Sequence, residues 1–517
     1  MNRLVVCVAW GLLLAGCPDA PVPCAEGLAR CGEACVDLAG ASEHCGACGV
    51  VCGDTQACVE GACRCRPGTT ACGEACVVPA SDPSHCGGCA GQGGAVCAAE
   101  QVCQQGQCVA DCSGAFQRCG RACVEVATDA FHCGACGAVC ADVRSCHGGT
   151  CAYDVVAACF NTGQVVGIQV GTDARGPGTA VGVYPQSVAR MQDVLLVLDA
   201  ATRLRQVRLA DHEVLPAQNA TALVPNQLVV RDPYVLILNS SSNTLQVLRR
   251  DARPRPAEGL LLTDVASVNF GPNTNPYALA ELGSDVFVTL YGNLQGNPAA
   301  GGRVARVSMA DPLAPRVEDV FVLPTGEALR PFPGHETLPT PTGIAALRGR
   351  LYVTLNNLDP RDYSPGGPGL LARIDPDTRA VDLLDLGADC LNPGWVAPVG
   401  ERLVVSCGGR ARYDASFNLI GVESTGLVLL EADGSVLDSL VLSCPQDTSC
   451  ALPSAGRFAV VGSRIYVGDV NAGRIFVVEV VGEALVARRG LDTVEPPLLA
   501  CPRSNGPSLV GDVVALP

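Results

Sequence analysis

A repeated spacing of cysteines is the strongest constraint on how this chain can fold. Of its 32 cysteines, 24 fall between residues 24 and 151. In residues 24–63, eight cysteines are separated by 6, 3, 9, 2, 3, 5 and 4 residues, and residues 112–151 repeat all seven intervals. Residues 65–108 keep six of them and lengthen the fifth from 3 to 7 residues. This agreement identifies three copies of one small unit.

Each unit has few large apolar side chains, and a segment of about 40 residues is rarely stable through a hydrophobic core alone. The even number of cysteines in each unit favours disulfides, which typically stabilise small exported domains. Zinc is the alternative, because Cys45-x-x-Cys48 with the adjacent His44 has the spacing of metal ligands. An oxidising compartment disfavours thiolate ligation, so we expect disulfides and no metal. Eight cysteines allow 105 pairings, and the sequence does not choose among them.

The first twenty residues indicate export. Arg3 precedes an apolar run at residues 4–14, which ends in Leu-Ala-Gly-Cys at residues 14–17. This ending resembles the lipobox of bacterial lipoprotein signals. The resemblance implies that residues 1–16 are removed and that Cys17 is acylated. Plain secretion and a retained helix are the alternatives, but the run is shorter than the roughly 20 residues that cross a bilayer.

The cysteine units also share short phrases. Cys-Gly-Glu-Ala-Cys occurs at residues 31–35 and 72–76, and Cys-Gly-Arg-Ala-Cys at 119–123. Together with the lipobox, these units resemble the cysteine-rich repeats of myxobacterial lipoproteins, which precede a larger C-terminal domain. The resemblance implies a lipid-anchored linker at residues 17–23, then a disulfide-stapled spacer, and an address at the outer membrane or cell surface. It implies no activity.

Residues 153–517 have the pattern of an all-β domain. Short strands rich in valine and leucine alternate with turn residues, without a helical period. A loose unit recurs at intervals of 40 to 65 residues, close to the 40 to 50 of propeller blades. Its copies begin at Pro185, Pro225, Pro276, Pro341, Pro393, Pro453 and Pro507.

The last copy is only half a unit, and the missing strands lie near residues 155–170. Joining the two ends of the domain would close a ring and remove two exposed sheet edges. We therefore predict a seven-bladed β-propeller with a composite closing blade; an array of β-sandwiches is the alternative. The phrases Leu-Tyr-Val-Thr-Leu-Asn-Asn and Cys-Phe-Asn-Thr-Gly-Gln-Val, at residues 351–357 and 159–165, resemble YVTN/NHL-type bacterial propellers.

Six cysteines lie in this domain. Cys444 and Cys450 bracket a short turn, and Cys390 and Cys407 bracket two strands of one blade. If these four cysteines form two pairs, Cys159 and Cys501 remain. A disulfide between them would link the two ends of the predicted propeller domain.

Composition excludes several functions. All 35 basic residues are arginine, which excludes Schiff-base and phosphate-loop lysines. The net charge of −16 argues against nucleic acid as a partner. The domain contains no catalytic motif that we recognise, and His212 and His335 are expected on its surface. We expect no catalytic residue and no cofactor, and a monomer.

Loop length points to a binding face. The turns after the second strand are long in three successive blades, at residues 291–302, 356–369 and 406–426. In a propeller they would emerge together, and variable loops on a rigid scaffold commonly carry binding. The candidate residues are Tyr291, Asn293, Asn356, Asn357, Asp359, Arg361, Tyr363, Arg410, Arg412, Tyr413 and Asp414.

We therefore expect a lipid-anchored protein that binds a protein, a glycan or a small molecule without transforming it. Loops without any ligand, a purely structural surface protein, and a hydrolase like the propeller lactonases are the alternatives. The lactonase alternative would require carboxylates that converge in the central channel.

Overall fold

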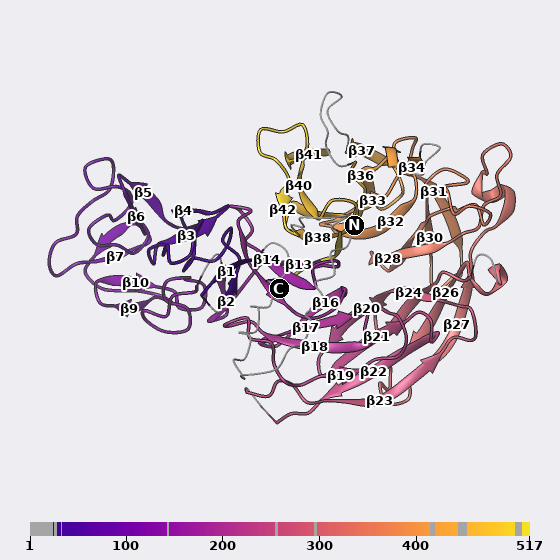
Figure 1. The fold of residues 1–517 in the computed structure, drawn as a ribbon, viewed down its shortest axis with the longest axis horizontal. Helices are drawn as coiled ribbons and strands as arrows, with labels where there is room; N and C mark the ends of the chain where they lie inside the picture. The colour runs from indigo at the N-terminus through magenta and orange to yellow at the C-terminus, as the bar shows by residue number, and fades with distance from the viewer. Residues whose placement is uncertain are drawn as a thin grey trace, which may run out of the picture.

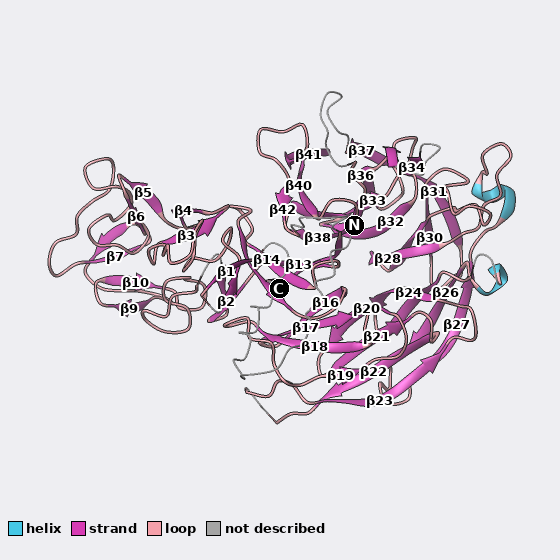
Figure 2. Cartoon of the chain, viewed as in Figure 1, coloured by secondary structure: helices cyan, strands magenta, loops and turns pink. Residues whose placement is uncertain are grey.

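Among the described residues, the regular secondary structure is almost entirely β-strand (Figure 2). The computed structural model describes residues 24, 28–32, 34–141, 144–253, 257–293, 297–413, 419–442, 452–501 and 509–516. Two short 3-10 helices, η1 (Pro298–Ala300) and η2 (Gly326–Leu329), are the helical segments of that part of the chain. None of its helices has the length and hydropathy needed to cross a membrane. The predicted all-β class is confirmed.

Residues 24–151, which we call the cysteine-rich arm, consist of small β-hairpins. The strands are β1 (Ala29–Cys31), β2 (Ala34–Val36), β3 (Gln56–Val59), β4 (Ala62–Cys65), β5 (Thr70–Cys72), β6 (Ala75–Val77), β7 (Val102–Gln104), β8 (Gln107–Val109), β9 (Gln117–Cys119), β10 (Ala122–Val124), β11 (Ser145–His147) and β12 (Thr150–Ala152).

All three units of the arm have the same disulfide pattern. Numbered within a unit, cysteine 1 pairs with 3, 2 with 5, 4 with 7, and 6 with 8. In the first unit the bonds are Cys24–Cys35, Cys31–Cys48, Cys45–Cys58 and Cys52–Cys63. In the second and third they are Cys65–Cys76, Cys72–Cys89, Cys86–Cys103, Cys97–Cys108, Cys112–Cys123, Cys119–Cys136, Cys133–Cys146 and Cys140–Cys151. The zinc alternative does not fit these sulfurs, because each is bonded to another sulfur.

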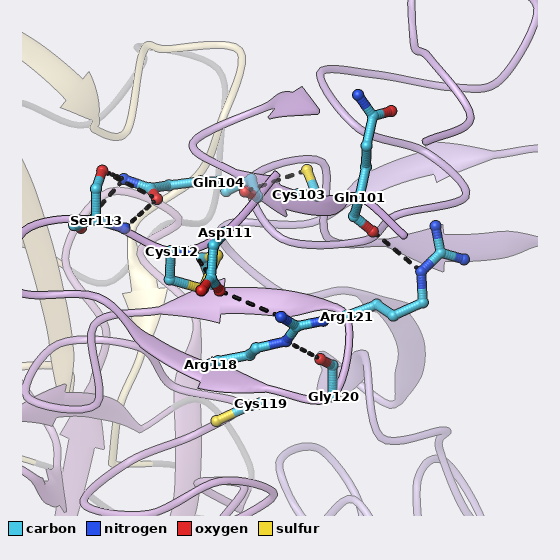
Figure 3. The surroundings of a disulfide bond; sticks show 12 residues. Gln101, Cys103, Gln104, Asp111, Cys112, Ser113, Arg118, Cys119, Gly120 and Arg121 are labelled. Atoms are coloured by element: carbon cyan, nitrogen blue, oxygen red, sulfur yellow. Dashed lines mark hydrogen bonds and ion pairs between the residues drawn. A yellow bond between two sulfur atoms is a disulfide. The ribbon is translucent and has the colours of Figure 1, made fainter. Parts of the chain in front are cut away.

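The second and third units are joined by backbone and side-chain contacts (Figure 3). β7 pairs with β10 in parallel, and Ser113 N–H donates to Gln104 Oε1 at 3.0 Å. Arg121 donates to the carbonyl oxygens of Gln101 and Cys97 at 3.1 and 3.0 Å. Arg66 of the second unit donates to Arg144 O of the third at 3.2 Å. The second and third units therefore form one compact body.

Residues 153–516 form seven antiparallel sheets, each built on four strands. The first three are β43 (Val510–Ala515), β13 (Val155–Cys159), β14 (Gln164–Ile168) and β15 (Arg175–Ala180); then β16 (Pro185–Met191), β17 (Val194–Asp199), β18 (Arg203–Arg208) and β19 (Asn219–Ala220); then β20 (Pro225–Arg231), β21 (Tyr234–Asn239), β22 (Thr244–Arg250) and β23 (Leu262–Asn269). The fourth and fifth are β24 (Pro276–Leu282), β25 (Asp285–Leu290), β26 (Arg303–Ser308) and β27 (Arg316–Val322); then β28 (Pro341–Leu347), β29 (Arg350–Leu355), β30 (Leu370–Ile374) and β31 (Val381–Asp385).

The last two sheets carry additions. They are β32 (Pro393–Val399), β33 (Arg402–Cys407), β36 (Gly426–Glu431) and β37 (Val436–Val441); then β38 (Ala455–Val461), β39 (Arg464–Asp469), β40 (Arg474–Val481) and β41 (Ala484–Arg489). The sixth sheet has a separate hairpin between its second and third strands, β34 (Arg410–Tyr413) and β35 (Leu419–Glu423), and in the seventh β42 (Leu498–Leu499) also pairs with β40.

The sheets are arranged around a common centre (Figure 1). Their innermost strands β43, β16, β20, β24, β28, β32 and β38 contact one another in succession, and β38 contacts β43. The circle of sheets is thus closed, and we call residues 153–516 the ring. The closing sheet takes its innermost strand from the C-terminal end and its other strands from residues just after the arm.

Two disulfides lie within the ring. Cys159 of β13 is bonded to Cys501, and Cys390 is bonded to Cys407 of β33. The pairing expected for Cys444 and Cys450 lies outside the described residues, as does Cys17.

The hydrophobic core lies between neighbouring sheets. Leu371 of the fifth sheet and Leu403 of the sixth, for example, belong to one buried cluster. Because each sheet is covered on both faces, its middle strands are buried throughout, as in β17. This burial explains why the strands read as continuous apolar runs rather than as alternating patterns.

The arm packs against the ring through its first and third units. Asp37 accepts a hydrogen bond from Arg175 Nη2 at 2.6 Å, with both side chains buried. Ala57 packs in one buried cluster with Tyr153 and Ala174. Arg144 of the third unit donates to Leu209 O at 3.3 Å.

The position of the first unit corrects the expectation of a spacer. An extended spacer would keep the first unit farthest from the ring, but the buried ion pair and apolar contacts hold it against the ring. Strands β5, β6, β7, β9 and β10 of the second and third units lie at the end of the arm that is farthest from the ring (Figure 1).

Candidate functional site

The register of the strands places the turns of successive sheets on one face of the ring. The first residue of each innermost strand pairs with the last residue of the second strand, as in Pro225 with Asn239 and Pro276 with Leu290. The turns after the second strands therefore emerge where the innermost strands begin. We call this side the loop face, and the three long loops lie on it in neighbouring sheets.

A polar pocket of about 380 Å³ lies on the loop face. It is formed by three successive sheets: by the β21–β22 turn, by the segments before and after the first hairpin of the fourth sheet, and by the loop after β29. Its described lining consists of Ser240, Ser241, Asn243, Asn273, Asn275, Tyr291, Gly292, Asn293 and Tyr363. None of these residues is charged.

Part of the lining is a hydrogen-bonded framework. Asn243 Oδ1 accepts from Asn275 N–H at 2.9 Å and from the Thr274 hydroxyl at 3.1 Å. Ser240 Oγ donates to Pro276 O at 3.0 Å, and Asn275 Nδ2 donates to Gly292 O at 3.3 Å. These bonds tie the β21–β22 turn to the next sheet, so the walls of the pocket are fixed relative to each other.

Other polar groups of the pocket remain available. Within the part of the chain that the structure describes, the side chains of Ser241, Asn273, Tyr291 and Tyr363 have no hydrogen-bond partner. Tyr277 stacks on Tyr291, with the ring centroids 5.9 Å apart. Burial, with Tyr277 and Tyr363 nearby, raises the pKa of the Tyr291 phenol well above its ordinary value. The phenol therefore stays protonated and can donate a hydrogen bond at neutral pH.

Left-handed backbone is concentrated at this pocket. Asn243, Asn273 and Asn275 have φ of 57°, 62° and 47°, a conformation that asparagine tolerates. Tyr363 has φ of 60° although its side chain is bulky, and 48% of the residue is exposed. Its N–H donates to Asp359 O at 2.8 Å. Backbone held in such conformations is common at ligand sites.

A second pocket of about 300 Å³ adjoins the first, and Tyr291 lines both. Its other described walls include Ala299, Val322, Leu338 and Pro339. It is therefore more apolar than the polar pocket.

Of the predicted loop residues, three line the polar pocket: Tyr291, Asn293 and Tyr363. Asn357 is fully buried, and its amide donates to Pro368 O at 2.7 Å. Asn356 lies 2.6 Å from the Thr342 hydroxyl and beside Asn392. Both asparagines therefore hold the long loop in place. The full burial of Asn357 argues against contact with a ligand, whereas contact of Asn356 with a ligand stays a prediction.

The charged candidates are also engaged within the loops. Asp359 is buried, 3.0 Å from His335 Nδ1, and pairs with Arg361, whose guanidinium and N–H hold the pKa of this carboxyl well below its ordinary value. Arg410 donates to Pro365 O at 2.6 Å, and Arg412 pairs with Glu423 at 2.8 Å. These four side chains stabilise loop conformations. Tyr413 is 58% exposed at the end of β34, and Asp414 lies outside the described residues.

A charged pair formed by described residues lies at the centre of the ring. Asp512 of β43 is buried, and burial raises the pKa of its carboxyl. Arg457 of β38 lies 3.7 Å from it, stacks on the Trp395 ring and donates to Asn226 O at 3.2 Å across the ring. Elsewhere in the described chain, groups of three or more adjacent metal-ligating side chains occur only among the disulfide-bonded cysteines of the arm.

A cavity of about 670 Å³ lies between the first arm unit and the ring. Most of its charged lining groups are paired: Asp37 with Arg175 at 2.6 Å, and Asp173 with Arg489 at 3.7 Å. This cavity belongs to the contact between arm and ring, so we do not take it as the functional site.

Sequence reasoning missed the contribution of short turns to the polar pocket. Ser241, Asn243, Asn273 and Asn275 lie in connections that are not lengthened. The sequence marks them only locally. Asn273 and Asn275 each stand next to a proline, and Asn243 lies in a turn of polar residues.

No family model and no curated protein matches this chain. Among solved structures it is similar to a putative 6-phosphogluconolactonase from Bacteroides fragilis, with 10% identity over 69% of this chain and 96% of that one and a TM-score of 0.45. It is similar to apo AztD from Citrobacter koseri, with 13% identity, 70% and 97% coverage and a TM-score of 0.43. It is also similar to the WD40 β-propeller domain of Doa1, with 12% identity, 61% and 86% coverage and a TM-score of 0.40.

Proposed function

We propose that this chain is an exported lipoprotein, anchored to the outer membrane or cell surface through acyl groups on Cys17, that presents a seven-bladed β-propeller as a recognition domain. In this proposal each of the seven sheets is one blade, and the closed circle of innermost strands supports it. The arm fixes the ring near the anchor instead of holding it at a distance.

Disulfides support export. The 28 cysteines that the structure describes form 14 disulfides, and such bonds persist in oxidising compartments. The lipobox-like ending at Cys17 supports the anchor. Cys17→Ala is expected to move the protein from the membrane fraction to the soluble fraction and to abolish labelling by a palmitate analogue. Retention of the label in the variant would refute the anchor at this residue.

The observation that carries the binding function is the polar pocket, in which three sheets bring uncharged tyrosine, asparagine and serine side chains to one opening on the loop face. Binding sites are commonly pockets on loops that a rigid scaffold positions. The lining includes no carboxylate, imidazole or thiol among its described residues, which supports binding rather than acid–base turnover.

Photo-crosslinking from the pocket rim tests this function. The full chain, made in its source cells, would carry a benzophenone amino acid at Tyr363 or, as the control, at Leu313. Both positions are 48% exposed, but Leu313 lies in the β26–β27 turn on the opposite face. We expect a saturable adduct from position 363 only. Equal labelling from both positions, or none from 363, would refute a binding function of the loop face.

A further inference from the structure

We propose that the polar pocket binds an uncharged carbohydrate, with one sugar ring against Tyr363 and its hydroxyl groups bonded to Ser241, Asn273 and Tyr291. This inference rests on the proposed recognition function and specifies the chemical class of the ligand. It is argued from the charge, the hydrogen-bonding groups, the aromatic surface and the rigidity of the pocket.

The charge of the pocket favours a neutral ligand. The nine described lining residues carry no charge, whereas the whole chain has a net charge of −16. A bound anion would lose hydration without gaining a cationic partner, and it would also meet the negative field of the protein. A bound cation would have no carboxylate in the lining. An uncharged polar ligand needs no oppositely charged partner in the pocket, and the net charge of the protein does not repel it.

The available polar groups match sugar hydroxyls. Each sugar hydroxyl both donates and accepts, and so do the Asn273 amide, the Ser241 hydroxyl and the two tyrosine phenols. The framework of the pocket already uses hydrogen bonds of the Ser240, Asn243 and Asn275 side chains. The pocket therefore separates side chains that hold its shape from side chains that can bind.

The aromatic rings provide the second half of carbohydrate recognition. A sugar ring has apolar faces made of C–H groups, and these pack against aromatic rings. The exposed ring of Tyr363 stands at the rim, and Tyr291, supported by Tyr277, forms a wall. Tyrosine also loses little conformational entropy on binding.

The size of the two pockets suits a short glycan. The polar pocket, at about 380 Å³, falls within the range of about 300–1,000 Å³ for small-molecule sites. The adjoining pocket, which shares Tyr291, has apolar walls at Val322, Leu338 and Pro339. It also has one charged lining residue, Arg303, whose Nη2 donates to Ala299 O at 2.7 Å. A second sugar could place its C–H face there, so we assign the adjoining pocket as a continuation of the site.

The shape of the pocket is held by the chain itself. Asn243 and Asn275, both in left-handed backbone, are joined by a hydrogen bond between two sheets, and Tyr363 is fixed by the loop around buried Asp359. Binding therefore orders few side chains, which preserves affinity that flexible loops would lose.

Binding of the full chain to an array of neutral and acidic oligosaccharides tests the inference, followed by titration of the bound neutral members. Tyr291→Phe keeps the ring and removes the phenol, and Asn273→Ala removes an exposed amide. Each is expected to weaken binding at least tenfold, equivalent to about 1.4 kcal/mol. The control Tyr234→Phe lies at the opposite edge of its sheet, where Tyr234 pairs with Arg231, and should change affinity less than twofold. Thermal unfolding of each variant verifies the fold.

Three results would overturn the inference: binding restricted to acidic glycans, equal affinity of all variants, or no binding to any array member. If no glycan binds but position 363 still forms a specific adduct with a protein, the recognition function stands and only the ligand class fails. If both experiments are negative, both proposals fail.

Discussion

His212 links the stability of the ring to pH. Its Nδ1 lies 2.8 Å from the Thr179 hydroxyl, and its ring packs edge-on against Tyr153. Burial, together with the charge of Arg144, lowers the pKa of His212 to about 4, although Asp211 opposes the shift. His212 is thus less exposed than an ordinary surface histidine, because Tyr153 packs against its ring and Arg144 of the arm lies nearby.

The sign of the effect follows from this shift. Between about pH 6.5 and 4 the unfolded chain binds a proton at His212 that the folded chain does not, so stability falls as the pH falls through this window. The contribution is up to about 3 kcal/mol. His212 has φ of 63°, so His212→Asn suits the backbone and removes the titration. Urea unfolding at pH 7, 5.5 and 4 should show that the free energy of unfolding falls less with pH in the variant than in the wild-type protein. An equal fall in both proteins would contradict a link between His212 and stability.

Gly167 is required by the packing of Tyr153. A Cβ at Gly167, in β14, would lie 1.9 Å from Tyr153 Cδ2, and this tyrosine is buried. Gly167→Ala is therefore expected to destabilise the ring by about 3 kcal/mol through overpacking. Gly394, in β32, is the control because a Cβ there would meet open space. Thermal unfolding should separate the two variants, and equal midpoints would show that Tyr153 moves freely.

At the scale of elements, the ring is closed by one disulfide between distant parts of the chain. Cys159–Cys501 spans 342 residues, whereas Cys390–Cys407 spans 17. Because loop-closure entropy grows with loop length, we expect the double variant Cys159→Ala/Cys501→Ala to lose about 5 kcal/mol and Cys390→Ala/Cys407→Ala about 3 kcal/mol. Urea unfolding without reductant measures both. The reverse order would mean that packing rather than chain entropy sets the effect.

The elements that the sequence predicted well are those with local signals. Pro185, Pro225, Pro276, Pro341 and Pro393 each begin an innermost strand, where the missing N–H is tolerated. The disulfide pattern inside the arm could not be predicted, because cysteine spacing alone leaves all pairings open.

The site was predictable only in part, for a physical reason. Loop length located the loop face and included Tyr291 and Tyr363. It could not show that Asp359 and Asn357 are buried inside their own loop, nor that Asn273 reaches the pocket from a short connection. Asn357 and Asp359 are buried by contacts with Pro368 and His335, and Asn273 reaches the pocket because neighbouring sheets are placed side by side. A local sequence pattern shows neither kind of contact.

For the whole molecule, the contact between arm and ring determines whether the protein is one rigid body. The buried pair of Asp37 and Arg175 is its main polar link, and Asp37 Oδ1 also accepts from Ala39 N–H at 2.9 Å within its own turn. Because the disulfides hold each unit, losing this link should free the first unit without unfolding it. The anchor proposed at Cys17 would then no longer fix the orientation of the ring.

Asp37→Asn preserves the turn but leaves the Arg175 charge buried without its partner, which typically costs about 3–5 kcal/mol. Hydrogen exchange should therefore become faster in β3 and β15, which contact each other at the interface. Asp111→Asn is the control, since the Asp111–Arg118 pair is exposed and such pairs contribute about 0–1 kcal/mol. Adding Arg175→Met to Asp37→Asn should restore slow exchange, because an apolar side chain can replace a buried charge. If hydrogen exchange in Asp37→Asn is as slow as in the control, the ion pair does not hold the arm against the ring. Apolar contacts such as those of Ala57 and Tyr153 then hold it.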